Sequence, residues 1–252
     1  MIQTVTYTTA QQRRQAESLA HQLALHTLPI TEISCGLVLN VTPMHLEIRD
    51  LEQGVAIHID FTTGTLAHRR QFGGGKNQPL ARAIGMKPGF TPRVLDATAG
   101  LAKDAFVLAT LGCPVTLIER SSCVAALIAD AIQRAADDES FSPLLQHGFE
   151  LVNANAIDYL SGLTAESKPD VIYLDPMYPE KQKTALVKKN MKILQKLLGQ
   201  DTDTEHLLSA ARMNARKRVV VKRPKGAEFI ADVKPAFAIA SKNTRYDVYL
   251  PF

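Results

Sequence analysis

The sequence predicts an α/β protein built around a mostly parallel β-sheet. From Arg93 onward, short apolar runs alternate with longer stretches of helical periodicity. Strands that alternate with helices indicate parallel strands joined by right-handed crossovers. The last two apolar runs, AFAIAS and RYDVYLP, are separated only by KNT. Because this linker is too short for a crossover, we expect the last pair of strands to be antiparallel.

The elements of this second part follow in chain order. We expect strands in RVLDAT, PVTLIE, FELVNANA, DVIYLDP and RVVVKRP, followed by the two runs above. Helices are expected from about Ala102, over SCVAALIADAIQRAADD, around AIDYLSGL, over residues 183–198 and over residues 204–215. Seven strands with an antiparallel insertion at the end resemble the sheet of the class I S-adenosylmethionine-dependent methyltransferases, which is Rossmann-like.

The first part of the chain has a different pattern. We expect a small amino-terminal α+β domain over residues 1–90 and the methyltransferase domain over residues 91–252. A helix is predicted over residues 9–26, and GLVLNVT, HLEIRDL and VAIHIDF have the lengths and apolar patterns of strands. Pro43 and the turn at Gln53-Gly54 separate these strands. The pattern suggests a small antiparallel unit.

Composition limits the class of protein. The chain has 252 residues, of which 46% are hydrophobic and 21% charged, and no apolar run approaches the roughly 18 residues that span a bilayer. The start MIQTVTYTTAQQRRQ lacks the charged-then-apolar order of a secretory signal. Cys35, Cys113 and Cys123 show no metal-ligand spacing and are predicted to be reduced core residues. We therefore expect a cytoplasmic protein without a membrane partner, and the net charge of +4 permits a nucleic-acid partner without requiring one.

The first candidate site is the loop VLDATAGLAKDAF, residues 94–106. A strand ends at Asp96, small residues turn at Gly100, and a helix begins near Ala102. Small residues let the backbone approach a ligand, and the helix amino terminus adds N–H groups and a positive dipole end. The loop resembles the methyltransferase loop D-x-x-x-G-x-G with its last glycine replaced, and it fits the NAD fingerprint G-x-G-x-x-G poorly. For the loop alone, a purely structural tight turn is the alternative.

Two later strand ends could complete a nucleoside site. Glu119 ends the next strand, 23 residues after Asp96, where doubly wound folds place an acid that receives ribose hydroxyls. A solvated strand-end glutamate is the alternative. Asn155 lies where the third strand should end and could contact the adenine edge, or it could be an ordinary turn asparagine.

The second candidate site is the stretch VIYLDPMYPEKQ, in which an apolar run ends at Asp175 and Pro176. It resembles the [D/N/S]-P-P-[Y/F/W] motif of methyltransferases that act on exocyclic or amide nitrogen, with Met177 in place of the second proline. The lone pair of a base amino group is delocalised and must be localised before it attacks a methyl group. Asp175 and the carbonyl of Pro176 are candidates to accept the two N–H bonds, and Tyr178 is a candidate to stack on the base. A strand followed by a simple proline turn is the alternative.

Basic residues near both sites are candidates for phosphate contact. They lie in HRRQFGGGK, in the helix EKQKTALVKKNMKILQK and at the end of the fifth strand. The predicted RNA-binding residues are Arg69, Arg70, Lys76, Lys181, Lys188, Lys222 and Arg223. The glycine-rich segment could instead be a flexible linker, and we interpret Lys192 and Lys196 as a solvated helix face.

The segments HRRQFGGGK, DATAGLAKDAFVLATLG, IERS, YLDPMYPEKQKTALVKKNM and KRVVVKRP, in this order, resemble the bacterial ribosomal RNA small subunit methyltransferase J family. Members of that family methylate the exocyclic N2 of one guanine in small-subunit rRNA. The resemblance runs from about His45 to about Tyr249. It implies S-adenosylmethionine contacts at Lys103, Asp104, Glu119, Arg120, Asn155, Ala156 and Asp175, in addition to the loop residues Asp96 and Gly100. The family usually has glycine where Ala102 stands.

The sequence therefore predicts an S-adenosylmethionine-dependent rRNA (guanine-N2)-methyltransferase whose partner is small-subunit rRNA or the small ribosomal subunit. No metal is expected, because the sulfonium already carries its leaving group, and no obligate protein partner is evident. One alternative is methylation of adenine N6 in DNA or another RNA, because the acceptor geometry is shared. Another is a non-catalytic RNA-binding protein on a methyltransferase scaffold.

Overall fold

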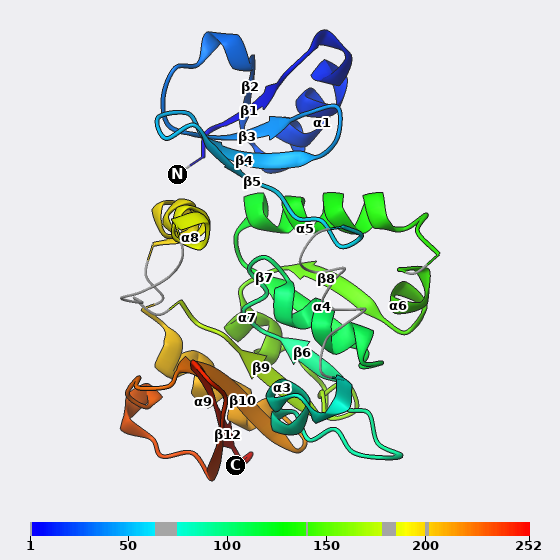
Figure 1. Ribbon diagram of the computed structural model, residues 1–252, viewed down its shortest axis with the longest axis vertical. Helices are drawn as coiled ribbons and strands as arrows, with labels where there is room; N and C mark the ends of the chain where they lie inside the picture. Colours follow the sequence, from blue (N-terminus) through cyan, green and yellow to red (C-terminus); the bar gives the residue numbers. More distant parts are fainter. Residues whose placement is uncertain (1, 64–74, 140, 178–184, 200–201) are drawn as a thin grey trace.

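The computed structural model describes residues 2–63, 75–139, 141–177, 185–199 and 202–252. Within these residues the chain forms two β-sheets, a five-stranded sheet near the amino terminus and a seven-stranded sheet that follows it. Figure 1 shows the smaller sheet at the top, with helices α5 and α8 between it and the rest of the molecule. The fold is α/β, as predicted, with a mostly parallel sheet of seven strands.

The seven-stranded sheet has the order β11-β12-β10-β9-β6-β7-β8. Its strands are β6 (Val94–Asp96), β7 (Val115–Glu119), β8 (Phe149–Asn153), β9 (Val171–Leu174), β10 (Arg218–Pro224), β11 (Phe237–Ala240) and β12 (Thr244–Tyr249). The five strands from β6 to β10 pair in parallel, whereas β12 pairs antiparallel with both β10 and β11. The antiparallel pairing predicted for the last two strands is confirmed.

Helices cover both faces of this sheet because its strands are apolar on both sides. The helices of this part are α3 (Pro79–Ala83), α4 (Lys103–Thr110), α5 (Ser122–Ala135), α6 (Ser142–Gln146), α7 (Ala156–Ser161), α8 (Ala185–Leu198) and α9 (Thr204–Asn214), with short 3-10 helices η3 (Gly75–Asn77) and η4 (Ile230–Asp232). Successive strand residues alternate between two cores: Val171 belongs to the core that includes α4 and α5, and Ile172 to the core that includes α7 and α9. The sheet is thus the middle layer of three.

The amino-terminal sheet has the order β2-β1-β3-β4-β5. It contains β1 (Thr4–Tyr7), β2 (His26–Pro29), β3 (Leu37–Val41), β4 (Leu46–Asp50) and β5 (Val55–Ile57), with helix α1 (Arg13–Leu23) and 3-10 helices η1 (Ala10–Gln12) and η2 (Ile30–Glu32). The three predicted strands β3, β4 and β5 pair antiparallel, as expected, but the sheet as a whole is mixed, because β1 pairs in parallel with both β2 and β3. The predicted helix over residues 9–26 is too long, since Ala24 adopts a left-handed conformation (φ 53°) that ends it.

Residues that follow the small sheet pack with the larger one. Phe61 stacks on Phe106 and Phe141 with ring centroids 5.0 and 5.4 Å apart. Helix α3 lies against β11 and β12. The division of the chain after residue 90 stays a prediction, but the packing of α3 assigns residues 79–83 to the larger sheet.

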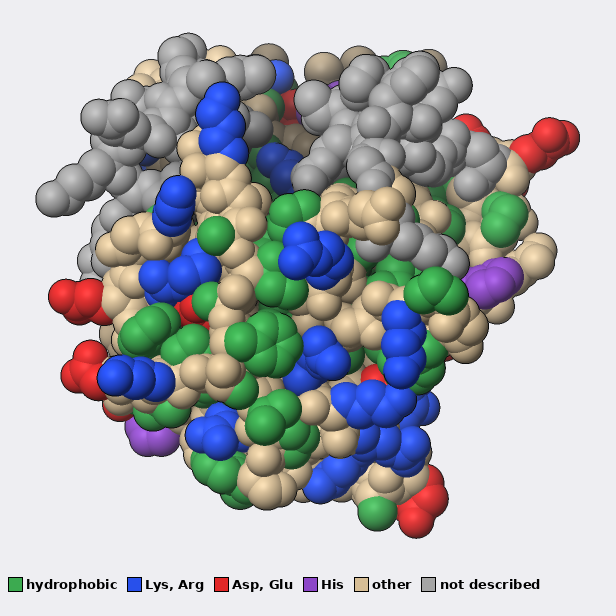
Figure 2. Space-filling view, turned by 60° about the horizontal axis from the view of Figure 1, so that its bottom comes forward, with side chains coloured by type: hydrophobic (Ala, Val, Ile, Leu, Met, Phe, Trp, Pro, Cys, Tyr) green, Lys and Arg blue, Asp and Glu red, His purple; other side chains and the backbone are tan. Residues whose placement is uncertain are grey.

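The surface is rich in basic side chains. Figure 2 shows Lys and Arg side chains spread over one face of the molecule, with Asp and Glu mainly at its margins. None of the helices in the described ranges is long and apolar enough to cross a membrane. Cys113 is buried, but Cys35 is exposed, so the prediction that all three cysteines are core residues is wrong for Cys35.

Candidate cofactor and methyl-acceptor site

A cavity of about 790 Å³ opens at the carboxyl ends of the parallel strands. This is the edge where open α/β sheets bind their ligands, and the volume lies in the range of small-molecule pockets. The predicted site residues that line it are Asp96, Gly100, Lys103, Asp104, Glu119, Arg120, Asn155, Ala156, Asp175, Pro176, Lys222 and Arg223. Residues from five separate strand ends and the helices that follow them thus meet at one site.

The loop after β6 forms one wall of the cavity. Asp96 ends β6, and one of its carboxylate oxygens accepts a hydrogen bond from the Thr98 N–H at 3.0 Å. Gly100 has a φ of 52°, and a Cβ there would meet only the Thr98 carbonyl oxygen, at 3.8 Å. Ala102, the N-cap of α4, is also left-handed (φ 55°), a conformation that glycine adopts at lower cost. The loop therefore keeps its backbone open to a ligand.

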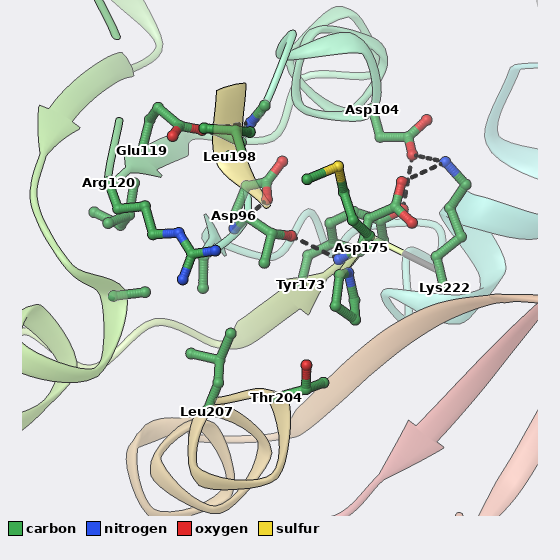
Figure 3. Close-up of a pocket in the computed structure, with 18 of the residues that line it drawn as sticks. Asp96, Asp104, Glu119, Arg120, Tyr173, Asp175, Leu198, Thr204, Leu207 and Lys222 are labelled. Carbon is green, nitrogen blue, oxygen red and sulfur yellow. Dashed lines mark hydrogen bonds and ion pairs between the residues drawn. The ribbon is translucent and has the colours of Figure 1, made fainter. Parts of the chain in front are cut away.

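Glu119 joins this loop to the end of β7. Its Oε2 accepts a hydrogen bond from the Gly100 N–H at 2.9 Å, and its Oε1 accepts one from the Ser121 N–H at 2.7 Å. The residue is 5% exposed. Each carboxylate oxygen has a second lone pair, so the same group is able to accept hydrogen bonds from the hydroxyl groups of a ligand in the cavity. Figure 3 shows Glu119 and Arg120 on the side of the site opposite Lys222.

The third strand end contributes Asn155 and Ala156. Asn155 is the N-cap of α7, and its Oδ1 accepts a hydrogen bond from the Ile157 N–H at 2.8 Å. The asparagine thus has a capping role and also lines the cavity. Ala156 is buried. Its contact with a ligand would be limited to its methyl group and backbone.

Asp175 lies at the other end of the site, directly after β9. Its backbone N–H donates to the Thr98 hydroxyl at 2.6 Å, which joins it to the loop after β6. Its Oδ2 lies 2.7 Å from the Lys222 Nζ, and the same ammonium lies 2.6 Å from the Asp104 Oδ2. The Tyr173 hydroxyl donates to that Asp104 oxygen at 2.8 Å. Figure 3 shows these groups converging from α4, β9 and β10.

The electrostatics of the site are dominated by buried acids. Burial raises the pKa of Asp96 to about 8, and the nearby Asp104 and Asp175 add to the rise. Burial also raises the pKa of Tyr173, again with Asp104 and Asp175 contributing. For Lys222, burial acts to lower the pKa, but Asp175 and Asp104 outweigh it and raise the pKa above its usual value. Asp96 is therefore mainly protonated at neutral pH, whereas Lys222 stays an ammonium between Asp104 and Asp175.

Comparison with known proteins identifies the family. Residues 18–251 match the family described as "Putative SAM-dependent methyltransferase". The chain is 50% identical over 238 residues to ribosomal RNA small subunit methyltransferase J of Aeromonas hydrophila, covering 94% of this chain and 93% of the relative. It is 46% identical over 248 residues to the protein of that name from Nitrosococcus oceani, covering 98% and 97%. The chain belongs to the ribosomal RNA small subunit methyltransferase J family.

A solved structure agrees with this assignment. A SAM-dependent methyltransferase from Neisseria gonorrhoeae superposes with a TM-score of 0.77 at 32% identity, covering 99% of this chain and 96% of that one. The resemblance drawn from the sequence motifs is therefore confirmed. Membership of the methyltransferase J family also makes S-adenosylmethionine the cofactor.

The residues of the cavity fit that cofactor. The loop at Gly100 leaves open space where a side chain would stand, and Glu119 offers acceptors suited to ribose hydroxyls. Apolar side chains of Ile118, Ile157 and Leu207 line the cavity and suit a nucleobase. The acids Asp104 and Asp175 suit a sulfonium and an ammonium group.

Some predicted residues of this methyltransferase lie where nothing is described. Tyr178, Arg69, Arg70 and Lys181 fall outside the described residues, as do the side chains of Lys76 and Lys188. The predicted phosphate contact of Lys222 and Arg223 stays a prediction. In the structure both side chains make contacts within the protein. Lys222 points to the two acids of the cavity, and Arg223 is 8% exposed with its Nη2 donating to the Glu228 carbonyl at 3.0 Å.

Sequence reasoning missed the part of the cavity made by helices α8 and α9. Leu194 and Leu198 of α8 and Thr204 and Leu207 of α9 line it. Arg120 also reaches α9, with its Nη1 3.4 Å from an oxygen of Asp203. The helices themselves were predicted, but apolar periodicity does not tell which helix end folds over the cavity.

Proposed function

We propose that this protein transfers a methyl group from S-adenosylmethionine to the exocyclic N2 of a guanine in small-subunit ribosomal RNA. The observation that carries the proposal is the position of Asp175. Its carboxylate lies at the end of β9, in the same cavity as the Gly100 loop and Glu119. The family to which the chain belongs supports the rRNA substrate, and the motif resemblance supports guanine N2.

The bound cofactor supplies an electrophilic methyl group on a sulfonium. In the proposed mechanism, one N–H of the guanine amine donates a hydrogen bond to the Asp175 carboxylate, and the other N–H donates one to the carbonyl of Pro176. These two acceptors localise the nitrogen lone pair and point it at the methyl group. The new C–N bond would replace the methyl–sulfur bond of the cofactor, whose electron pair stays on sulfur as a neutral thioether. The Asp175 carboxylate would stabilise the positive charge that the nitrogen gains, until its proton leaves to water.

The RNA is held by surfaces around this cavity. We propose that Tyr178 stacks on the target guanine and that Arg69, Arg70, Lys76, Lys181 and Lys188 contact phosphates. We propose that the amino-terminal sheet, which lies beyond α5 and α8 in Figure 1, extends this contact surface. The many basic side chains of the surface in Figure 2 are consistent with a polyanionic partner. A cytoplasmic location follows from this substrate and stays a prediction.

The experiment that tests the proposal is transfer of a labelled methyl group to small ribosomal subunits isolated from cells that lack this protein. Naked rRNA and duplex DNA are assayed alongside, and the products are digested to nucleosides. Label in N2-methylguanosine is the expected result. Label in N6-methyladenine would instead favour the alternative acceptor, and cofactor binding without transfer to any sample would contradict the substrate assignment.

The same assay tests the role of Asp175. Asp175→Ala is expected to abolish transfer while the protein still folds, because the amine loses its carboxylate acceptor. Asp158→Ala is the matched control, since Asp158 lies in α7 and does not line the cavity. Retained transfer by Asp175→Ala would remove this residue from the mechanism.

A further inference from the structure

The ammonium of Lys222 is bound by two acids of the cavity. It lies 2.6 Å from the Asp104 Oδ2 and 2.7 Å from the Asp175 Oδ2. The three residues come from α4, the end of β9 and β10, and all three line the cavity; β9 and β10 are neighbours in the sheet. The Lys222 side chain is 28% exposed, so water screens this cluster only in part.

The cluster has a net negative charge even with lysine present. Two carboxylates that lie this close to one nitrogen would repel each other without it. A cation beside a carboxylate favours the ionised form, and its removal favours the protonated form. A protonated Asp175 would no longer offer the guanine amine a negatively charged acceptor.

We propose that Lys222 is a positioning residue that acts through Asp175: its ammonium holds the Asp175 Oδ2 and keeps the carboxylate ionised and oriented to accept the amine. This inference rests on the proposed function of Asp175. Asp104, fixed by the Tyr173 hydroxyl at 2.8 Å, holds the other side of the ammonium. Lys222 thus contributes to the acceptor rather than to a phosphate site.

Within the described residues, charged and titratable groups from several elements surround Asp175. Asp104 of α4 and Lys222 of β10 contact it directly or through the ammonium, and Asp96 of β6, Tyr173 of β9 and Tyr246 of β12 form the surrounding group. Among the groups just named, Lys222 is the cation, and it contacts Asp104 and Asp175 directly.

The test is the rate of a single turnover of methyl transfer, measured from pH 5.5 to 9.5. Lys222→Met is expected to shift the acid limb of the pH–rate profile to higher pH by about one unit. The rate on the acid side then falls about tenfold, and at alkaline pH it returns to that of the wild type. Lys222→Arg should keep the acid limb near that of the wild type.

Asp104→Asn should shift the acid limb to lower pH, because one negative charge beside Asp175 is lost. Lys234→Met, at an exposed lysine, is the charge-matched control and should behave as the wild type.

Three outcomes would overturn the inference. A Lys222→Met rate that falls equally at every pH would mean that Lys222 does not act through ionisation of Asp175. Loss of cofactor affinity by calorimetry with an unmoved acid limb would assign Lys222 to the cofactor instead. If Lys222→Met fails to fold, Asp104→Asn decides: an acid limb that does not shift to lower pH in that variant overturns the inference.

A second measurement separates this inference from the proposed function. Carboxyl titration by carbon-13 NMR, assigned with Asp175→Asn, reports the ionisation of Asp175 without any substrate. A higher titration midpoint for Asp175 in Lys222→Met supports the inference even if no RNA accepts a methyl group. An unchanged midpoint overturns it even if the wild type methylates guanine.

Discussion

Glu119 shows how one side chain at a strand end serves both the fold and the site. Both of its oxygens already accept backbone N–H bonds, from Gly100 and Ser121. These bonds fix the loop after β6 against the end of β7, and the same oxygens keep lone pairs for a ligand. The structural and binding roles of such a residue cannot be separated by removing the whole side chain.

Glu119→Gln is expected to weaken S-adenosylmethionine binding about tenfold and to lower the free energy of unfolding by about 1 kcal/mol. The glutamine amide keeps one acceptor oxygen, but its NH2 group would face the backbone N–H of either Gly100 or Ser121. Glu119→Ala should weaken binding further, because the loop loses both anchors. Isothermal titration calorimetry measures the affinity, with Glu150→Gln at an exposed position of β8 as the control. An affinity equal to that of the wild type in both Glu119 variants would refute the ribose role.

Asp96 should make the stability of the cofactor-free protein depend on pH. Its pKa is raised to about 8 in the folded state, against about 3.9 in an unfolded chain. Between these values the folded state binds a proton that the unfolded state has lost, so stability falls as pH rises. The stabilisation is fully present below about pH 4 and is lost as the pH rises through about 8, with a limiting slope of about 1.4 kcal/mol per pH unit.

Asp96→Asn removes this titration, because the amide does not ionise. We expect the unfolding free energy of the wild type, relative to Asp96→Asn, to be lower at pH 8.5 than at pH 5.5. Urea denaturation of both proteins at several pH values measures the difference, in which the contributions of other groups cancel. Parallel curves for the two proteins would show that Asp96 ionises normally in the folded state.

Among the helices and strands, the sequence predicted the buried strands of the large sheet and the residues at their ends, but not the contacts that depend on the packing of distant elements. Asp96, Glu119 and Asp175 were correctly placed at strand ends because each terminates or directly follows a continuous apolar run. Strand β2 was missed, since HTLP is short, ends in proline and alternates exposed with half-buried residues. The cavity walls from α8 and α9 were also missed, because a local pattern carries no information about which distant strand end a helix covers.

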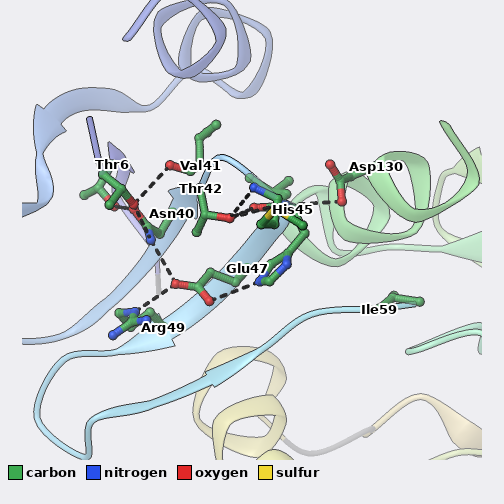
Figure 4. A network of polar contacts seen from close by, with 12 residues as sticks. Thr6, Asn40, Val41, Thr42, His45, Glu47, Arg49, Ile59 and Asp130 are labelled. Atoms are coloured by element: carbon green, nitrogen blue, oxygen red, sulfur yellow. Dashed lines mark hydrogen bonds and ion pairs between the residues drawn. The ribbon is translucent and has the colours of Figure 1, made fainter. Parts of the chain in front are cut away.

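The amino-terminal sheet contains a buried polar row that crosses three strands. Thr6, Asn40 and Glu47 are register neighbours on β1, β3 and β4. The Thr6 hydroxyl donates to the Asn40 Oδ1 at 2.9 Å, and the Asn40 Nδ2 donates to the Glu47 Oε1 at 2.9 Å (Figure 4). Burial acts to raise the pKa of Glu47, but hydrogen bonds from Asn40 and Arg49 outweigh it and lower the pKa. The row therefore holds an ionised carboxylate inside the sheet.

Asn40→Leu is expected to lower the free energy of unfolding of this sheet by about 2–3 kcal/mol, since it leaves both polar neighbours without their shared partner. Asn77→Leu, at an exposed position, is the control for the substitution itself. Chemical denaturation followed by circular dichroism measures the change. A loss no larger than that of the control would show that the row is not an energetic unit.

At the scale of the whole molecule, α8 joins the amino-terminal sheet to the cofactor cavity. Lys196 of α8 is exposed, as predicted for a solvated helix face, and lies 3.2 Å from the Asp50 Oδ2 of β4 and 3.1 Å from the Glu52 Oε2. Leu194 and Leu198 of the same helix line the cavity. A second connection runs through α5, where Asp130 accepts the Leu46 N–H at 3.2 Å. The small sheet thus supports a wall of the site that it does not itself form.

This arrangement predicts that a change in the small sheet alters cofactor binding. In Asp50→Asn the Oδ1 that accepts the Glu52 and Gln53 N–H groups is kept, whereas the negative charge that faces Lys196 is lost. We expect S-adenosylmethionine affinity to fall several-fold, because α8 is then held less firmly over the cavity.

Glu52→Gln is the matched control, since its carboxylate is 51% exposed whereas that of Asp50 is 4% exposed, and solvent screens an exposed ion pair. Calorimetry on both variants should therefore give a larger loss of affinity for Asp50→Asn. Equal affinities in both variants and the wild type would mean that α8 is held by its apolar face alone. In that case the two sheets would be joined without the smaller one influencing the site.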